Sequence, residues 1–261
     1  MKLIRKILVK MLGLRGYLRL VSGTYIKMVS MGMMKNKYPE LFFIKKAVKP
    51  GDVVIDIGAN LAYYSTVMAK TAGLEGQVYA VEPIPLFAEV WTKNMRSSKK
   101  YNVVLFNCAL GSEPEEKVKM SIPIKDGVVR HGLTKVVEEG DENEAVMSYD
   151  VPMKVGDELF QDKPLQKLDY VKCDVEGYEQ YVIPSFEKII SSFKPMFQIE
   201  LGGTENRSNV ADFLMNKGYE VYILKDHILN SISKEQMFEV NQDFYFIHAD
   251  DKANRKSLIK S

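Results

Sequence analysis

The sequence predicts an α/β protein with a doubly wound, mostly parallel sheet of seven strands, preceded by a helical extension and interrupted by a small β insertion. Short runs rich in valine and isoleucine alternate with amphipathic stretches from about residue 50 onwards. Continuous apolar runs are typical of parallel strands that are buried on both faces. The stretches between them have the length of helical crossovers. A chain of 261 residues is long enough for one such domain with an extension.

The expected elements follow one another along the chain. Pro50, Gly51 and Asp52 mark the turn before the first strand. The expected strands cover residues 52–56, 77–82, 102–107, 168–174, 195–201, 219–224 and 243–249. The expected helices cover residues 38–47, 60–73, 86–98, 178–191 and about 207–217. The last two strands are expected to form a hairpin-like pair joined by a long loop.

Residues 112–165 interrupt this alternation. Two stretches, 116–124 and 146–155, are expected to be antiparallel strands on either side of a polar segment with an acidic run, EEGDENE. The predicted domain organisation has four parts. They are a basic amphipathic helical extension (1–37), a main domain (38–250), the insertion (112–165) expected to cover the acceptor pocket of that domain, and a tail (251–261) expected to be frayed.

Charge is distributed unevenly along the chain. Residues 1–39 contain nine lysines and arginines and no acidic residue, which leaves 27 basic against 34 acidic residues in the rest. An acidic main domain is a poor nucleic-acid binder, so no nucleic-acid partner is expected. The two cysteines, Cys108 and Cys173, lie in apolar stretches and suit a reducing compartment. We therefore expect a cytoplasmic protein.

Residues 1–22 are expected to form a basic amphipathic helix. One face carries Ile4, Ile7, Leu8, Met11, Leu14 and Leu18, and the roughly opposite face carries Lys2, Arg5, Lys6 and Lys10. No run approaches the ~20 apolar residues that span a bilayer, and Lys10 interrupts the stretch that a signal peptide would need. Two alternatives remain: the apolar face packs on the main domain, or it lies on an anionic membrane surface.

Four acidic residues end four of the predicted strands: Asp56, Glu82, Asp174 and Glu200. In a doubly wound sheet, ligands bind beyond the carboxyl ends of the strands. A carboxylate that ends an apolar strand is costly without a partner, so four of them predict a site.

The turn after Asp56 indicates which ligand this site takes. The stretch from Gly58 lacks the second and third glycines of a dinucleotide fingerprint. Asp56 would also repel a pyrophosphate, which disfavours an NAD-dependent oxidoreductase. Glu82 suits the two cis hydroxyls of a ribose. A cationic nucleoside without phosphate fits these residues, and S-adenosylmethionine is such a molecule.

Three stretches resemble the FkbM family of S-adenosylmethionine-dependent methyltransferases: GDVVIDIGANLAYYS (51–65), VYAVEPIP (78–85) and LDYVKCDVEGYEQYVI (168–183). They carry D-x-G-A-N, E-P-x-P and K-x-D-x-E-G-x-E in the family's order, and the resemblance covers roughly residues 40–250. Ala62 stands where the family usually has glycine. We expect this to be the mildest replacement at a first helical turn, with slightly tighter contact to the cofactor's methionine portion.

The resemblance implies a class I methyltransferase fold and methyl transfer, mostly to hydroxyl oxygens of sugars and other natural-product or cell-envelope molecules. The candidate cofactor-binding residues are Asp56, Gly58, Ala59, Asn60, Tyr64, Glu82, Asn107 and Cys108. Residues 58–60 are expected to line the methionine portion, and Asp56 to order the turn or receive the ammonium through water. Asn107 and Cys108 end the third strand beside the expected adenine. Tyr63 and Tyr64 are not distinguished: one is expected to cover the cofactor and the other to pack.

The candidate catalytic residues are Asp174, Glu176, Lys172 and His131. Lys172 and Asp174 point to one face of a strand, about 7 Å apart, and a buried lysine needs a partner. Asp174 and Glu176 are expected nearest the transferred methyl, with one of them as the base. His131 is a further candidate base in the insertion.

Two alternatives concern the same acidic residues. They could form a structural ion-pair network around Lys172. Asp174, Glu176 and Glu200 could instead bind a cation such as Mg²⁺, which prefers oxygen ligands. The sequence contains no dedicated ligand cage, so no metal site is predicted.

The expected function is O-methylation of a hydroxyl on a sugar, glycan, glycolipid or related metabolite. The basic extension favours a membrane-bound acceptor. A nucleic-acid methyltransferase is an alternative, against which stand the acidic main domain and the absence of N-P-P-Y or P-C-type motifs. A non-enzymatic membrane-surface protein with a vestigial cofactor fold is another, and the acids at four strand ends oppose it.

Overall fold

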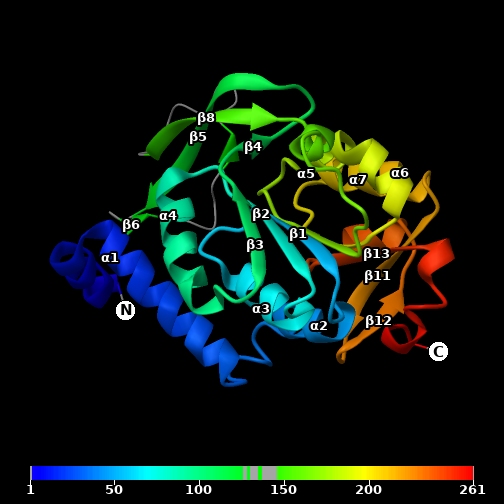
Figure 1. Cartoon of the computed structure of the whole chain (residues 1–261), viewed down its shortest axis with the longest axis horizontal. Coiled ribbons are helices and arrows are strands. Elements are labelled where there is room, and N and C mark those ends of the chain that lie inside the picture. The colour runs from blue at the N-terminus through cyan, green and yellow to red at the C-terminus, as the bar shows by residue number, and fades with distance from the viewer. Residues whose placement is uncertain (1, 126–127, 130–134, 137–145, 261) are drawn as a thin grey trace.

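The main sheet is mostly parallel and doubly wound. The structure is a computed structural model that describes residues 2–125, 128–129, 135–136 and 146–260. The strands of the sheet are β1 (Val53–Ile57), β2 (Gln77–Val81), β3 (Asn102–Phe106), β9 (Tyr170–Cys173), β10 (Met196–Ile199), β11 (Tyr219–Lys225), β12 (Ile228–Ser231) and β13 (Phe244–His248). Among the described residues their order is β12-β11-β13-β10-β9-β1-β2-β3 (Figure 1). The predicted fold class is therefore confirmed.

The seven predicted strands are all present, and β12 is an eighth. It pairs antiparallel with β11 at the edge of the sheet, inside the loop that was expected to join the last two predicted strands. β13 runs antiparallel to both β10 and β11. The start of β13 therefore lies at the same edge of the sheet as the carboxyl ends of the parallel strands.

The order of the strands reverses between β1 and β9. From β1 the chain continues through β2 to β3 on one side, and from β9 to β10 on the other. The register places Asp56 opposite Lys172 and Ile57 opposite Cys173. A crevice at such a reversal, beyond the carboxyl ends of the strands, is where ligands bind in doubly wound sheets.

Helices cover both faces of the sheet. One face is covered by α2 (Pro39–Ala47), α3 (Tyr63–Ala72) and α4 (Pro85–Asn94), which continues as the 3₁₀ helix η1 (Met95–Ser98). The other is covered by α5 (Glu179–Val182), η3 (Pro184–Phe186), α6 (Glu187–Phe193) and α7 (Thr204–Met215). The single helix expected over 178–191 is thus broken. Pro184 explains the break, because proline lacks the N–H that a continuous helix needs.

The insertion forms a second, smaller sheet. Its strands are β4 (Ala109–Leu110), β5 (Glu115–Lys125), β6 (Val128–Val129), β7 (Lys135–Val136) and β8 (Val146–Lys154), followed by η2 (Gly156–Phe160). The long strands β5 and β8 pair antiparallel, as predicted. Their apolar side chains share a core with Phe87 and Val90 of α4. His131 and the acidic run 138–144 lie outside the described residues.

The N-terminal helix α1 (Lys2–Ser30) consists of two helical segments that meet at Gly13, whose φ of 66° and ψ of 167° are not helical. Tyr17 and Leu18 in the second segment are buried against α4. Arg15 and Arg19 of the same segment form ion pairs with Glu89. None of the described helices is long and apolar enough to cross a membrane.

The C-terminal residues are packed, and the expectation of a frayed tail is wrong for the described part. This region contains η4 (Glu235–Glu239), η5 (Ala249–Asp251) and η6 (Lys256–Leu258). Arg255 is buried and donates hydrogen bonds to the carbonyl oxygens of Ala47 and Asp169. Leu258 is also buried, and the Lys260 N–H donates to Leu229. A buried guanidinium with carbonyl acceptors fastens the tail to the sheet.

Candidate active site

The turn after β1 is fastened to strands on both sides. The N–H groups of Gly58 and Ala59 both donate to the Val81 carbonyl at 3.0 Å. Gly58 has a φ of 74°, and a Cβ there would lie 1.9 Å from the Asp174 carbonyl oxygen. The close approach of β9 therefore accounts for this glycine without a ligand. The expected contact of residues 58–60 with the cofactor stays a prediction.

Ala62 differs from its expected setting. It precedes α3 instead of lying in its first turn, and its φ of 72° is in the left-handed region. Glycine adopts this conformation readily, whereas a residue with a Cβ is strained there by about 1–2 kcal/mol. The replacement of the family's glycine therefore strains the backbone, which corrects the expectation of a mild exchange in a helical turn.

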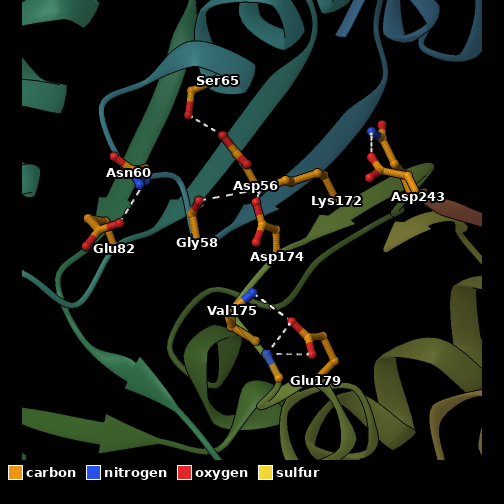
Figure 2. A network of polar contacts seen from close by, with 12 residues as sticks. Asp56, Gly58, Asn60, Ser65, Glu82, Lys172, Asp174, Val175, Glu179 and Asp243 are labelled. Carbon is orange, nitrogen blue, oxygen red and sulfur yellow. Dashed lines mark hydrogen bonds and ion pairs between the residues drawn. The ribbon is translucent and has the colours of Figure 1, made fainter. Parts of the chain in front are cut away.

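Glu82 joins the ends of β1 and β2. One carboxylate oxygen accepts a hydrogen bond from the Asn60 N–H at 2.7 Å (Figure 2), and the other accepts one from the Ile84 N–H at 2.9 Å. Burial raises the pKa of Glu82 to about 7, although these two N–H groups act against the rise. Each oxygen keeps a further lone pair. The carboxylate is thus held in place while it can still accept hydrogen bonds from two hydroxyls.

Asn107 and Cys108 follow β3 and differ in their surroundings. The Asn107 amide donates to the carbonyl oxygens of Glu82 at 2.6 Å and Pro83 at 3.1 Å, which ties the end of β3 to the end of β2. The Cys108 side chain is buried in the core. Burial raises the pKa of its thiol to about 11, so it is neutral at ordinary pH. Of the two, Asn107 is the residue whose side chain lies at the edge of the site.

Asp56 lies beneath the turn and is fully buried. It accepts a hydrogen bond from the Ser65 hydroxyl, which in turn accepts one from the indole N–H of Trp91 at 2.8 Å. Burial raises the pKa of Asp56, and the nearby Lys172 opposes the rise. Its other oxygen has no hydrogen-bond partner among the described residues. This setting favours a role in ordering the turn over direct contact with the ammonium.

Lys172 is a buried cation held by the site. Its Nζ lies 3.2 Å from Asp174 Oδ2, 3.5 Å from the Gly58 carbonyl oxygen and 4.8 Å from the centre of the Tyr64 ring (Figure 2 shows the first two contacts). Burial acts to lower the pKa of Lys172, but the Asp174 and Asp56 carboxylates outweigh it and raise the pKa. Lys172 therefore stays protonated and positions Asp174 instead of accepting a proton.

The two tyrosines after the turn, Tyr63 and Tyr64, differ in the residues that they contact. Tyr64 lies against Lys172, and burial followed by the Asp243 carboxylate raises its pKa well above the usual value. The Tyr63 ring packs edge-on against Tyr25 of α1, with the ring centres 4.7 Å apart. Tyr64 is thus the one of the pair that faces the site.

Glu176 and Glu200 are the acids with raised pKa values on the reaction side. Partial burial, and then the nearby Asp174 and Glu200 carboxylates, raise the pKa of Glu176 to about 8. Partial burial and Asp174 raise that of Glu200 to about 7. Both carboxylates line a cavity of about 450 Å³ between the ends of β9 and β10 and the start of α7. The cavity is also lined by Gly177, Gln180, Gly202, Gly203, Thr204, Glu205 and Asn206.

Glu179, the last acid of the K-x-D-x-E-G-x-E motif, is structural. It is fully buried and accepts hydrogen bonds from the Val175 N–H at 2.8 Å and the Gly177 N–H at 3.1 Å (Figure 2). It accepts a third from the Asn206 amide at 2.7 Å. Glu176 has a left-handed φ of 57° within this turn. The buried Glu179 thus shapes the turn that presents Glu176 to the cavity.

Asp243 is a residue of this edge that sequence reasoning missed. It directly precedes β13 and accepts a hydrogen bond from the Gln198 amide at 2.6 Å (Figure 2). Burial and the Asp174 carboxylate raise the pKa of Asp243, and Lys172 acts against the rise. In the sequence, Asp243 appears as an acid that precedes an apolar strand. This pattern predicts a site residue only if β13 is known to be antiparallel, so that its start lies at this edge.

The acidic residues at this edge of the sheet fit a cationic ligand without phosphate. Glu82, Asp174, Glu176, Glu200 and Asp243 all lie near the carboxyl edge, and the buried cation there is already paired with Asp174. A pyrophosphate would be repelled, whereas a sulfonium and an ammonium would be attracted. Among the described residues, no group of three or more possible ligands is arranged to hold a metal ion, so the Mg²⁺ alternative gains no support.

Solved structures and curated proteins with similarity to this chain are methyltransferases. The crystal structure of a methyltransferase FkbM from Methylobacillus flagellatus KT is 12% identical and covers 79% of this chain and 50% of that one, with a TM-score of 0.49. The fibrillarin of Aeropyrum pernix, with natively bound S-adenosyl-L-methionine, is 13% identical and covers 77% of this chain and 68% of its own, with a TM-score of 0.44.

The curated relatives match only a short segment. A protein-L-isoaspartate O-methyltransferase of Aeropyrum pernix is 39% identical over 56 residues, which is 22% of each chain. Another, from Archaeoglobus fulgidus, is 35% identical over 69 residues, which is 26% of this chain and 32% of that protein. The chain thus spans less than a third of the length of these relatives.

A sequence model described as the methyltransferase FkbM domain matches residues 56–221. This range begins at Asp56 and contains the three motifs around the turn after β1, the end of β2 and the end of β9. Since it covers more than half of the 261 residues, the chain belongs to the family of the methyltransferase FkbM domain.

Proposed function

We propose that the protein methylates a hydroxyl oxygen of a sugar, glycan, glycolipid or related metabolite. The observation that carries this proposal is the cavity lined by Glu176 and Glu200, two acids whose pKa values are raised by partial burial and by the nearby Asp174 carboxylate. A hydroxyl has a high pKa, so its proton must pass to a base for the oxygen to react. Carboxylates also accept hydrogen bonds from the several hydroxyls that a sugar presents.

For the cofactor, the proposed contacts are made by residues that follow β1, β2 and β3. Glu82 would accept hydrogen bonds from the ribose hydroxyls, the turn at Gly58–Asn60 would contact the methionine portion, and Asn107 would border the adenine. When bound, S-adenosylmethionine supplies an electrophilic methyl group on a sulfonium. The residues of this chain then have to orient an acceptor oxygen in line with that group and remove its proton.

We assign the role of base to Glu176. Lys172 forms an ion pair with Asp174 at 3.2 Å, and this fixed carboxylate is suited to orient the acceptor hydroxyl. Among the described residues Glu176 forms no ion pair; it lines the cavity, and partial burial and the Asp174 carboxylate raise its pKa to about 8. His131 remains a predicted alternative base in the insertion, outside the described residues.

Methyl transfer should depend on pH through Glu176. A base works in its deprotonated form, so kcat/KM should fall as the pH drops through about 8, with a slope of one on a logarithmic plot. Initial rates from about pH 6 to about pH 10 would show this limb. Glu176→Gln should lower kcat by at least about 100-fold and remove the limb. Glu205→Gln, in the wall of the same cavity, should leave it in place, and an unchanged limb in Glu176→Gln would contradict the assignment.

The acceptor class can be tested by the chemistry of the product. The protein is incubated with methyl-labelled S-adenosylmethionine and, in turn, with sugars and glycans, extracted glycolipids, peptides and RNA. Methylation of a hydroxyl gives an ether that survives mild alkali, whereas methylation of a carboxyl gives an ester that releases methanol. Alkali-stable label in a saccharide supports the proposal. Alkali-labile label in a peptide, or label released by nuclease, would assign a different acceptor.

A nucleic-acid acceptor is not part of the proposal. Beyond residue 39 the chain contains 27 basic and 34 acidic residues, and the cavity at the reaction centre is lined by glutamates. Binding of a nucleic acid requires basic residues that neutralise its phosphates. The charge at the site therefore favours a neutral or cationic acceptor.

A further inference from the structure

The first segment of α1 exposes an apolar stripe to solvent. Ile4, Ile7 and Met11 are 64%, 48% and 75% exposed, and their spacing places them on one face of the helix. Leu8 and Val9 of the same segment instead pack against the core shared by α4 and the insertion. The segment is thus held to the protein by one side and presents a second apolar side that nothing in the described residues covers.

Gly13 separates this segment from the rest of α1. Its non-helical backbone divides the helix, and a Cβ at this position would contact nothing within 4 Å. Beyond the glycine, Arg15 and Arg19 are paired with Glu89, and Leu18 is buried. The alternative that the extension packs on the main domain therefore describes the segment after Gly13. The segment before Gly13 keeps an uncovered amphipathic face among the described residues.

Charge distinguishes the possible occupants of that face. Lys6 and Lys10 are exposed and, among the described residues, have no acidic partner. Both lie beside the stripe, because Lys6 precedes Ile7 and Lys10 precedes Met11. A second copy of the chain would bring like charges together at this face, which costs free energy. An anionic lipid surface offers phosphates to the lysines and an apolar layer to the stripe.

We propose that residues 4–12 bind the protein to the surface of an anionic bilayer, with Ile4, Ile7 and Met11 inserted between the headgroups and Lys6 and Lys10 at the phosphates. Such a segment lies in the plane of the interface and does not span it. The apolar stripe is short and is flanked by the two exposed lysines Lys6 and Lys10, so the binding is reversible and sensitive to salt. This inference holds for any acceptor and does not rest on the proposed function.

The location of the segment relative to the site gives the docking a consequence. Leu8 packs against the apolar cluster that also contains Leu61 and Ile84. Leu61 directly follows Asn60, and Ile84 lies two residues after Glu82, so the segment and the turns after β1 and β2 belong to one packed cluster. A bilayer that holds residues 4–12 would therefore be linked through this cluster to the turns of the proposed cofactor site.

The test is sedimentation of the full chain with lipid vesicles. Vesicles of phosphatidylcholine with a minor fraction of phosphatidylglycerol should carry the protein down at low salt, and high salt should release it. Vesicles of phosphatidylcholine alone should bind at least about tenfold less. Lys6→Gln with Lys10→Gln should lower the partition coefficient roughly 25-fold, at about fivefold per lysine. Ile7→Ser with Met11→Ser should lower it by at least about tenfold.

Matched variants guard against a general effect of charge or hydrophobicity. Lys99→Gln with Lys163→Gln removes the same charge from exposed sites elsewhere, and Leu74→Ser removes an apolar side chain that is 59% exposed in another loop. These variants should bind vesicles as the unchanged protein does. Equal losses in the control and test variants, or equal binding to both kinds of vesicle, would overturn the proposal. So would a dimer in sedimentation velocity that Ile7→Ser with Met11→Ser converts to a monomer, because a second copy would then cover the stripe.

Discussion

Replacing Glu82 with alanine should lower the affinity for S-adenosylmethionine by at least about 100-fold. The reason is the loss of two hydrogen bonds from the ribose hydroxyls to a charged acceptor, each worth about 1.5–3 kcal/mol. The variant should also lose about 2–4 kcal/mol of unfolding free energy, because the buried N–H groups of Asn60 and Ile84 lose their acceptor. Calorimetric titration with S-adenosylhomocysteine and urea unfolding would measure the two effects separately.

Asp157 provides a matched control for this variant. Its carboxylate also accepts hydrogen bonds from two N–H groups, those of Lys188 at 3.0 Å and Ile189 at 3.1 Å, but these belong to the start of α6, away from the proposed cofactor site. Asp157→Ala should therefore destabilise the protein without weakening cofactor binding. If Glu82→Ala bound S-adenosylhomocysteine within a few-fold of the unchanged protein, Glu82 would have only the structural role of joining β1 and β2.

Gly58→Ala should destabilise the protein by about 2–5 kcal/mol, the sum of left-handed strain and overpacking. The added Cβ would lie 1.9 Å from the Asp174 carbonyl oxygen, so the turn after β1 and the end of β9 would have to separate. Because Asp174 and its partner Lys172 would move with that strand end, methyl transfer should be lost as well. Urea unfolding and a methyl-transfer assay on folded protein are the measurements.

Gly51→Ala separates the two causes. Gly51 also has a positive φ, 85° against 74°, in the turn closed by the hydrogen bond from the Asp52 N–H to the Lys49 carbonyl, yet a Cβ there would meet nothing within 4 Å. The substitution should therefore cost only the strain of the positive φ, about 1–2 kcal/mol, and leave activity intact. Equal costs for the two substitutions would show that β1 and β9 can part without penalty, contrary to the packing described here.

The main sheet was predictable because its strands are buried on both faces and therefore appear as uninterrupted apolar runs. β12 was missed because Ile228–Ser231 is a short edge strand whose polar residues resemble a loop. The packing of the C-terminal residues was missed for a different reason. It depends on Arg255, whose acceptors at Ala47 and Asp169 are far away in the sequence, and no local pattern encodes such bonds.

The candidate site was predictable where parallel strands end in acids, because parallel strands bring their carboxyl ends together. Asp243 was not found in this way, since it stands at the beginning of a strand and reaches the edge only because β13 is antiparallel. The reason for Gly58 was also hidden, because the Asp174 carbonyl that excludes a side chain belongs to a strand more than a hundred residues away. The sequence contains Gly13, but it does not show that the backbone leaves the helical conformation there. Nor does it show that Glu89 holds only the segment after the glycine, through Arg15 and Arg19.

Trp91 donates a hydrogen bond to Ser65, which donates one to Asp56, so the fluorescence of this indole is sensitive to the structure around Asp56. Trp91 is the one tryptophan of the chain, so intrinsic indole emission comes from a single place. That place is the contact between α3, α4 and the carboxyl end of β1, directly beneath the turn described for the cofactor. Its fluorescence therefore follows the order of this turn without any label.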